Sequence, residues 1–309
     1  MKKERWLYAF DYYHAAGFCS ELNNLLYALY YFQRHQLKYA IVSTNWISSG
    51  PEGWAQFFTS LEREHRALSG RHRAILKLHS FESALRRLLP NRLYEYVRPS
   101  LIRRGYNLLY NDFVVVRGRP TFHLVREYAR QQRERDLSGF QRNLHHLSNS
   151  IWCIQPRIAA EVSRYLPPTP HYTAIHVRRG DKITEREDRE YAIDEYIQVL
   201  KNLPVPSPDL FIMSDDQRVV DEFRELLPEC VIHRGPEKTT EGYSQHVFQS
   251  MDRNARIEAT EQLIVEIEIA RQATYFLGTF NSNVFRLLDY LRDHDSIDIS
   301  GLQQSPSEL

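Results

Sequence analysis

The chain has 309 residues, enough for one or two domains, and 42% of them are hydrophobic, as in ordinary globular proteins. Its 40 basic and 39 acidic residues leave a net charge of +1, which excludes a globally basic surface for nucleic acid or an anionic membrane. Three widely spaced cysteines exclude a disulfide framework and a CxxC zinc site.

The sequence shows no signal peptide, no apolar run long enough to span a membrane and no Asn-x-Ser/Thr glycosylation acceptor. We therefore expect a cytoplasmic protein, unless the sequence is the lumenal part of a longer one.

The first third of the chain begins with a strand-helix-strand pattern. An apolar strand is predicted at residues 6–10, an amphipathic helix at 21–34 and a second strand at 39–43. This order is a βαβ unit and predicts a parallel sheet. Residues 61–149 are rich in arginine and mostly helical in pattern, with a strand at 113–116.

The second half alternates strands with helices after a proline-rich boundary at residues 167–170. Strands are predicted at 173–177, 209–213, 230–232 and 275–277, and helices at 194–201, 217–226, 256–273 and 282–292. The predicted class is α/β, with an N-terminal α/β domain at residues 1–168, a Rossmann-like domain at 169–302 and a polar tail at 303–309.

The most informative segment for chemistry is 176–182, which reads His-Val-Arg-Arg-Gly-Asp-Lys and follows a predicted strand. In open α/β sheets, ligands bind at the carboxyl ends of the strands. Arg178 and Arg179 point in opposite directions there, so one can face a ligand while the other is held by the protein. An arginine fork binds phosphate bidentately. A turn with solvated charges is the alternative that the residues alone leave open.

An ordered series of segments resembles the α1,6-fucosyltransferase family, which includes the core fucosyltransferase of N-glycans and the nodulation-factor enzyme of bacteria. The segment at 176–182 resembles the His-x-Arg-Arg-x-Asp motif of that family. The other matching segments, in chain order, are Gly17-Phe18, Asn45-Trp46, Gly53-Trp54, Gln155-Pro156, Ser214-Asp215-Asp216 and Gly278-Thr279-Phe280 through Arg286. The resemblance implies a GT-B-like fold with two Rossmann-like domains and the donor site in the C-terminal one.

The resemblance also implies roles for individual residues in binding GDP-fucose. Arg178 is expected to hold the pyrophosphate, His176 the guanine and Ser282 the β-phosphate, which also fits a helix N-cap. Glu266, on the preceding helix, is expected to accept from guanine N1 and N2, and it is more enclosed by apolar neighbours than Glu268. The other predicted donor-binding residues are Arg179, Gly17, Phe18 and Asn283.

Catalysis in the resembled family implies inversion at the anomeric carbon, with Arg178, Lys182 and Asp181 near the reacting atoms. The general base is either Glu185, counted forward from the motif, or Glu187, counted backward from the next helix. The pair Asp215-Asp216 offers a possible magnesium site. The resembled family is metal-independent, however, so no metal and no other cofactor is expected.

The expected activity is therefore that of a fucosyltransferase, in the hexosyltransferase class and of the α1,6 type, which moves fucose from GDP-fucose to an oligosaccharide or glycoconjugate. Use of another GDP-sugar and a non-catalytic glycan-binding role are the alternatives. A nucleic-acid binder is a further one, because arginines gather at residues 63–73 and 126–142, although acidic residues are mixed through both stretches.

Overall fold

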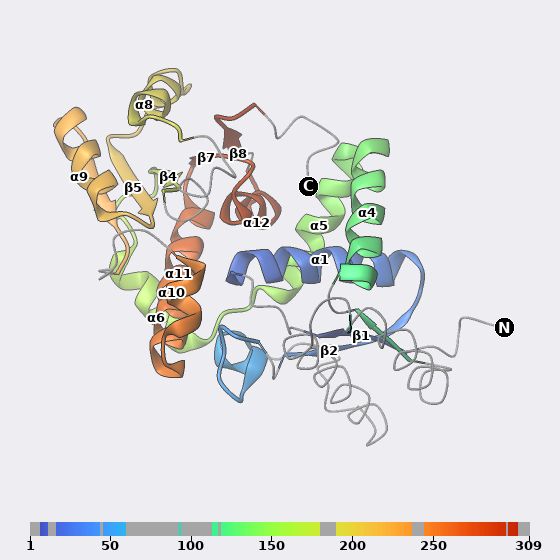
Figure 1. Ribbon diagram of the computed structural model, residues 1–309. Helices are drawn as coiled ribbons and strands as arrows, with labels where there is room; N and C mark the ends of the chain where they lie inside the picture. Colours follow the sequence, from blue (N-terminus) through green and yellow to red (C-terminus); the bar gives the residue numbers. More distant parts are fainter. Residues whose placement is uncertain are drawn as a thin grey trace.

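The computed structural model describes residues 7–11, 17–43, 46–59, 93, 113–116, 119–179, 190–236, 244–294 and 296–301. Two parallel sheets organise these residues, one from each half of the chain (Figure 1). Across the described ranges, no helix is both long and apolar enough to cross a bilayer.

The N-terminal sheet has three strands in the order β2-β1-β3. Its strands are β1 (Leu7–Asp11), β2 (Lys38–Val42) and β3 (Phe113–Val116), and β1 pairs in parallel with both neighbours. Helix α1 (Phe18–Arg34) connects β1 to β2. The predicted βαβ unit is therefore confirmed, and the isolated strand predicted at 113–116 joins it as the third strand.

The C-terminal sheet has five parallel strands in the order β6-β5-β4-β7-β8. The strands are β4 (Thr173–Val177), β5 (Asp209–Ser214), β6 (Val231–Arg234), β7 (Tyr275–Gly278) and β8 (Ser296–Asp298). The chain moves from β4 outward to β6 and then crosses back to β7 on the other side of β4. Such a crossover in a doubly wound sheet creates a ligand-binding crevice at the carboxyl ends of the strands.

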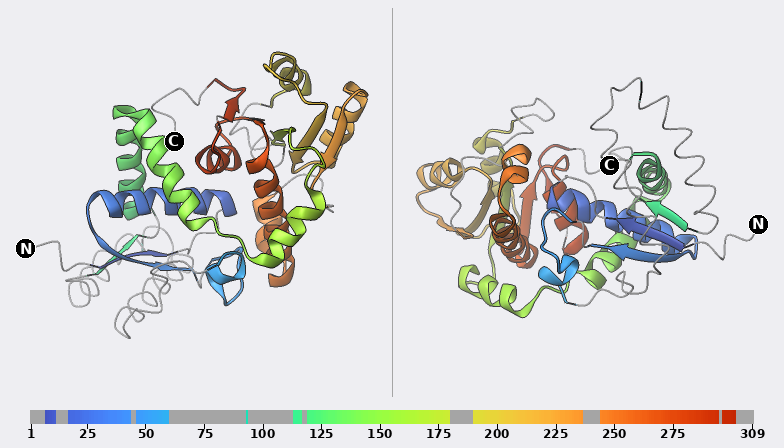
Figure 2. Two further views of the ribbon diagram at one scale, coloured as in Figure 1. Left: turned by 180° about the vertical axis from the view of Figure 1, so that it is seen from behind. Right: turned by 60° about the horizontal axis from the view of Figure 1, so that its bottom comes forward.

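Alternating side chains of this sheet supply two apolar layers. Ile175 and Ile212 pack with α8 (Ile193–Lys201) and α9 (Gln217–Leu226), whereas Ala174 and Phe211 face the opposite side. The helices on that opposite side are α11 (Arg253–Gln272) and α12 (Asn283–Leu291), and a short helix, α10 (Gln245–Ser250), precedes them. Figures 1 and 2 show α8 and α9 on the outer face and α11 and α12 on the inner face.

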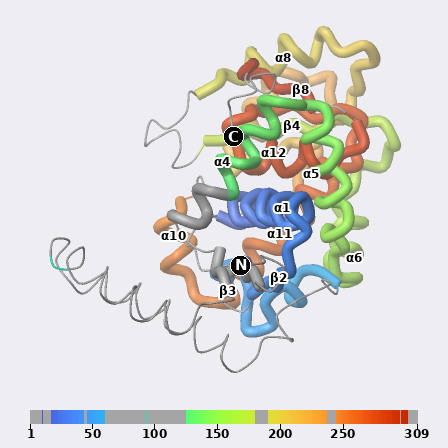
Figure 3. The backbone as a smooth tube through the Cα atoms, turned by 90° about the vertical axis from the view of Figure 1, so that its right-hand side faces the viewer, coloured from blue at the N-terminus to red at the C-terminus, as the bar shows by residue number. Residues whose placement is uncertain are grey.

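Helix α1 lies against the inner layer and joins the two halves of the molecule (Figure 3). The hydroxyls of Tyr27 on α1 and Tyr290 on α12 are 3.2 Å apart, and both side chains are buried. The remaining helices are α4 (Arg119–Arg135), α5 (Leu137–Ile151), α6 (Pro156–Tyr165) and the 3-10 helix η2 (Gly53–Gln56). One apolar core thus runs through both halves, and this core fixes the inner face of the C-terminal sheet.

The structure differs from the predicted elements at a few places. Helix α1 begins at Phe18, earlier than predicted, because its first turn follows the N-cap Gly17 directly. Strand β8 and helix α10 were not predicted, since β8 has only 3 residues and α10 only 6, too short for a clear hydrophobic period.

Candidate functional site

The two adjacent arginines after β4 point in opposite directions, as their sequence predicts. Arg179 is held by the protein: its backbone N–H donates to Asp215 at 2.8 Å, its Nη1 donates to the Tyr191 carbonyl at 2.9 Å, and its Nε lies 3.3 Å from Glu190. The positive charge of Arg178, in contrast, acts to lower the pKa of the Cys19 thiol. Arg178 therefore lies near Cys19, at the start of α1. Arg178 is therefore the arginine directed toward the inner face.

The pKa of the Cys19 thiol shows that the start of α1 is enclosed by the protein. Burial raises the pKa of Cys19 to about 12, and the nearby charge of Arg178 offsets only part of that effect. Only the thiolate is a strong nucleophile, so a buried thiol with this pKa is inert near neutral pH. Cys19 therefore contributes packing rather than chemistry.

We expect a thiol reagent at pH 8 to label the exposed Cys153 in the native protein and to reach Cys19 only after denaturation. Mass spectrometry of the labelled peptides distinguishes the two cysteines. Rapid native labelling of Cys19 at that pH would show that the start of α1 is not buried as the structure has it.

Helix α1 begins next to Arg178, and its second turn lies beside the start of α12. Gly17 is the N-cap of α1 and carries no capping side chain, while Ser282 caps α12 by accepting from the Val284 N–H at 3.2 Å. The Asn23 amide in the second turn of α1 donates to the Asn283 carbonyl at 3.0 Å, which ties α1 to the start of α12. The predicted N-cap role of Ser282 is confirmed. The first-turn N–H groups and the dipoles of both helices favour an anion at this α1–α12 junction.

The ring of Phe18 lies in the core rather than at a surface. It is 4% exposed and stacks on Trp46 with the ring centroids 5.2 Å apart. Any contact of residue 18 with a ligand must therefore come from its backbone, at the start of α1.

Residues 278–282, between β7 and α12, are held rigidly by three other elements. The backbone N–H of Phe280 donates to Asp298, the last residue of β8, at 2.9 Å. The guanidinium groups of Arg133 on α4 and Arg286 on α12 lie over the ring of Phe280, at 4.8 and 5.7 Å from its centroid. Arg286 also donates to the Asn281 carbonyl at 3.2 Å. The segment that presents Ser282 is thus fixed before any ligand arrives.

The contacts of Arg133 bear on the arginine-rich stretch at 126–142. Arg133 is only 1% exposed, and Arg130 forms ion pairs with Glu127 and Glu134 on the same helix. These arginines serve contacts within the protein, which argues against a basic binding surface on this part of α4. The other arginine-rich stretch, 63–73, lies outside the described residues.

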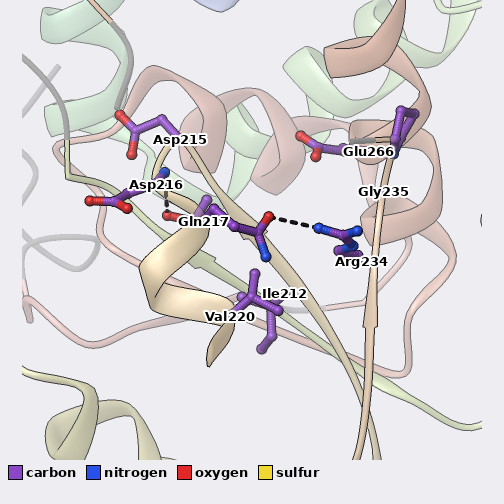
Figure 4. Close-up of a pocket in the computed structure, with 10 residues that line it drawn as sticks. Ile212, Asp215, Asp216, Gln217, Val220, Arg234, Gly235 and Glu266 are labelled. Carbon is purple, nitrogen blue, oxygen red and sulfur yellow. Dashed lines mark hydrogen bonds between the residues drawn. The ribbon is translucent and has the colours of Figure 1, made fainter. Parts of the chain in front are cut away.

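A pocket opens at the carboxyl ends of β5 and β6, beside α11 (Figure 4). Its polar walls come from residues on four elements, and its apolar floor includes Ile212 and Val220. The polar lining residues are Ser214, Asp215, Asp216, Gln217, Arg234 and Glu266. We call this the β5–β6 pocket. It brings several polar groups together over a small apolar base.

The two glutamates of α11 have different surroundings, as the sequence predicts. Glu268 accepts from the Trp152 indole at 2.8 Å and is also paired with Arg271 and Gln272, so its carboxylate is used inside the protein. Glu266 is 4% exposed, against 8% for Glu268, and it lines the β5–β6 pocket. Glu266 is therefore the carboxylate of α11 that a ligand in this pocket meets.

His176 lies between the two regions, at the end of the central strand β4. It pairs with Met213 of β5 in the sheet register, and its Cβ lies 3.6 Å from the position that a Cβ on Gly278 of β7 would occupy. A larger residue at 278 would also meet Phe285 at 2.8 Å, so glycine is needed there for close packing. His176 is 7% exposed and faces the inner layer with Arg178.

The two aspartates after β5 are both engaged by protein groups. Asp215 receives the backbone N–H of Arg179, as described above, and Asp216 caps α9 and binds the guanidinium of Arg218 at 2.6 Å. The hydrogen bonds from Arg218 hold the pKa of Asp216 below its usual value. Among the residues that the structure describes, no group of three or more His, Cys, Asp or Glu side chains is arranged to hold a metal ion.

Four predicted catalytic residues, Asp181, Lys182, Glu185 and Glu187, lie outside the described residues. The structure places the predicted Arg178 near the first turn of α1, which follows Gly17, and a hydrogen bond from α1 reaches Asn283, next to Ser282 at the start of α12. His176 lies two residues before Arg178 and packs near Gly278 of β7. Glu266 lies in the β5–β6 pocket, on the same edge of the sheet. Residues such as Asn23, Asp298 and Gly235, which support these groups, carried no signal in the sequence.

The two parallel sheets, with helices on both faces of the C-terminal one, form a GT-B-like α/β fold. Similar solved structures are fucosyltransferases: NodZ from Bradyrhizobium has a TM-score of 0.52 at 13% identity, with 94% of each chain covered. POFUT1 in complex with GDP-fucose has a TM-score of 0.51 at 12% identity, with 95% of this chain and 97% of that chain covered. A mutant of FUT1 from Arabidopsis thaliana, in complex with GDP, has a TM-score of 0.55 at 8% identity, with 95% and 70% covered.

No family model and no curated protein matches the sequence. The fold therefore supports the resemblance to fucosyltransferases that the motifs indicate, while the identities of 8 to 13% place the comparison at the level of fold.

Proposed function

We propose that this chain is an inverting fucosyltransferase that moves fucose from GDP-fucose to a hydroxyl of a glycan acceptor, with an α1,6 linkage. The observation that carries the proposal is the order of groups along one edge of the C-terminal sheet. Ser282 follows β7, Arg178 follows β4, and Glu266 lies beside the ends of β5 and β6. A phosphate-binding region thus adjoins a pocket with a buried carboxylate, which matches the two ends of a guanosine diphosphate.

The donor is proposed to bind with its base in the β5–β6 pocket, where the Glu266 carboxylate accepts from N1–H and N2–H of guanine. Its diphosphate lies at the α1–α12 junction, against Arg178 and the helix starts at Gly17 and Ser282. Arg179 contributes by fixing the loop after β4 rather than by touching the donor. We propose residue 168 as the boundary between an acceptor-side domain and the donor-side domain.

The reaction is proposed as a single displacement at the anomeric carbon of fucose. The acceptor oxygen forms a bond to that carbon while the bond from the carbon to the β-phosphate oxygen breaks, and the acceptor proton passes to a glutamate. That glutamate is Glu185 or Glu187, with Lys182 and Asp181 nearby. GDP leaves with its developing charge stabilised by Arg178 and the two helix dipoles, so we propose that no metal ion or other cofactor takes part.

The proposal is tested with a panel of nucleotide sugars, measured for binding and for slow hydrolysis with and without EDTA. We expect GDP-fucose to be preferred over other GDP-sugars and over UDP-sugars, and we expect EDTA to leave the rate unchanged. Preference for another GDP-sugar would identify a different transferase, and binding without any turnover would indicate a glycan-binding homologue. Loss of activity in EDTA, restored by Mg²⁺, would overturn the metal-independent mechanism.

A further inference from the structure

The β5–β6 pocket contains a cation as well as a carboxylate. Arg234 is the last residue of β6 and lines the pocket together with Glu266 of α11 (Figure 4). Gly235 and Pro236 complete this wall. The pocket therefore offers a guanidinium donor fork and a carboxylate acceptor pair to the same ligand.

The two groups are held next to each other by Gly235. A Cβ at this position would lie 2.6 Å from Cγ and 2.9 Å from Oε1 of Glu266, closer than real side-chain contacts allow. The Glu266 side chain consequently packs directly on the backbone that follows Arg234. Only glycine permits that approach, which places the carboxylate beside the residue that carries the guanidinium.

Arg234 is also oriented by a neighbour. Its Nη1 donates to Oε1 of Gln217 at 2.9 Å, and Gln217 is the first residue of α9 and lines the pocket itself (Figure 4). The hydrogen bond to Gln217 thus fixes Arg234 at the pocket rather than in solvent.

We propose that Arg234 is a specificity-determining residue that recognises O6 and N7 of guanine. This assignment rests on the proposed use of a GDP-sugar. Guanine presents two donors, N1–H and N2–H, on one edge and two acceptors, O6 and N7, on the adjoining edge. A carboxylate matches the donors, and the planar guanidinium fork matches the acceptors. Adenine presents an amino donor at position 6, which meets the guanidinium donors of Arg234 and leaves them unpaired.

The test compares three nucleotides by isothermal titration calorimetry with wild type and Arg234→Met. GDP and IDP share O6, whereas 2,6-diaminopurine riboside diphosphate carries an amino group there. We expect Arg234→Met to weaken the binding of GDP and of IDP by the same factor, roughly 10- to 100-fold. The binding of the diaminopurine nucleotide should change much less. Arg234→Lys should fall between, because it keeps the charge and loses the fork.

Two control variants separate this role from others. Glu266→Gln should weaken the binding of GDP more than the binding of IDP, because IDP lacks the N2 amino group. Arg224→Met removes the same charge from an exposed ion pair on α9 and should leave GDP affinity unchanged. Thermal melting verifies that each variant is folded.

The outcomes that overturn the assignment are distinct. Equal weakening of all three nucleotides by Arg234→Met would indicate general attraction to the diphosphate, and unchanged GDP binding would remove Arg234 from the site; both leave the proposed function standing. Failure of the folded wild-type protein to bind GDP at all would overturn the proposed function together with this assignment.

Discussion

Arg178→Ala is expected to lower turnover of GDP-fucose by about 100- to 1000-fold while leaving the protein folded. The departing GDP develops negative charge, and loss of one preorganised donor at such a position typically has an effect of this size. In the structure Arg178 lies on the inner face near the first turn of α1, whereas its neighbour Arg179 is bound to Glu190 and Tyr191. Steady-state kinetics with saturating acceptor measures the loss.

The matched control is Arg164→Ala, which removes a 71% exposed side chain paired with Glu161 on α6. This variant should keep wild-type kinetics. Arg178→Lys should recover part of the activity, because it restores the charge without the bidentate fork. Nearly normal turnover in a folded Arg178→Ala protein would contradict the proposed diphosphate contact and move it elsewhere on the sheet edge.

Phe285→Ala is expected to lower the free energy of unfolding by about 3 to 5 kcal/mol, as large aromatic truncations in cores do. Phe285 is 0% exposed on α12, and its ring lies 5.4 Å from Phe276 and 6.2 Å from Phe280. It also touches Gly278 so closely that no Cβ fits there. The truncation therefore opens a cavity directly beneath the segment that presents Ser282.

Denaturant unfolding followed by circular dichroism measures this loss as a lower midpoint with an unchanged slope. Val205→Ala, which truncates a 70% exposed side chain, is the control and should change stability by less than about 0.5 kcal/mol. A loss below about 1 kcal/mol for Phe285→Ala would mean that the core beneath the segment 278–282 collapses around the missing ring.

Much of the local structure is determined by short-range sequence signals. Apolar alternation and proline positions predict the main strands and helices of the C-terminal half correctly, because each pattern acts within one element. The opposite directions of Arg178 and Arg179 also follow from strand geometry alone. Similarly, the apolar neighbours of Glu266 along α11 are enough to predict that it is buried.

The role proposed for Arg234 could not be predicted from the sequence. Ligands bind at the carboxyl ends of parallel strands, but the sequence predicts that β6 ends at residue 232, and the structure extends it to Arg234. What makes it significant is the approach of Glu266 across Gly235, and residues on β6 and α11 come together only through the crossover of the sheet.

The sequence by itself thus determined the α/β class and the main elements, and it predicted the segment 176–182 as the centre of the chemistry. Only the tertiary structure decided which groups share a site. It set the start of α1 near Arg178, joined α1 to the start of α12, placed the Phe18 ring in the core, and brought Arg133 onto the ring of Phe280. The reason is physical: hydrophobic periodicity fixes the buried face of each element locally, whereas the partner of that face depends on long-range packing of the whole core.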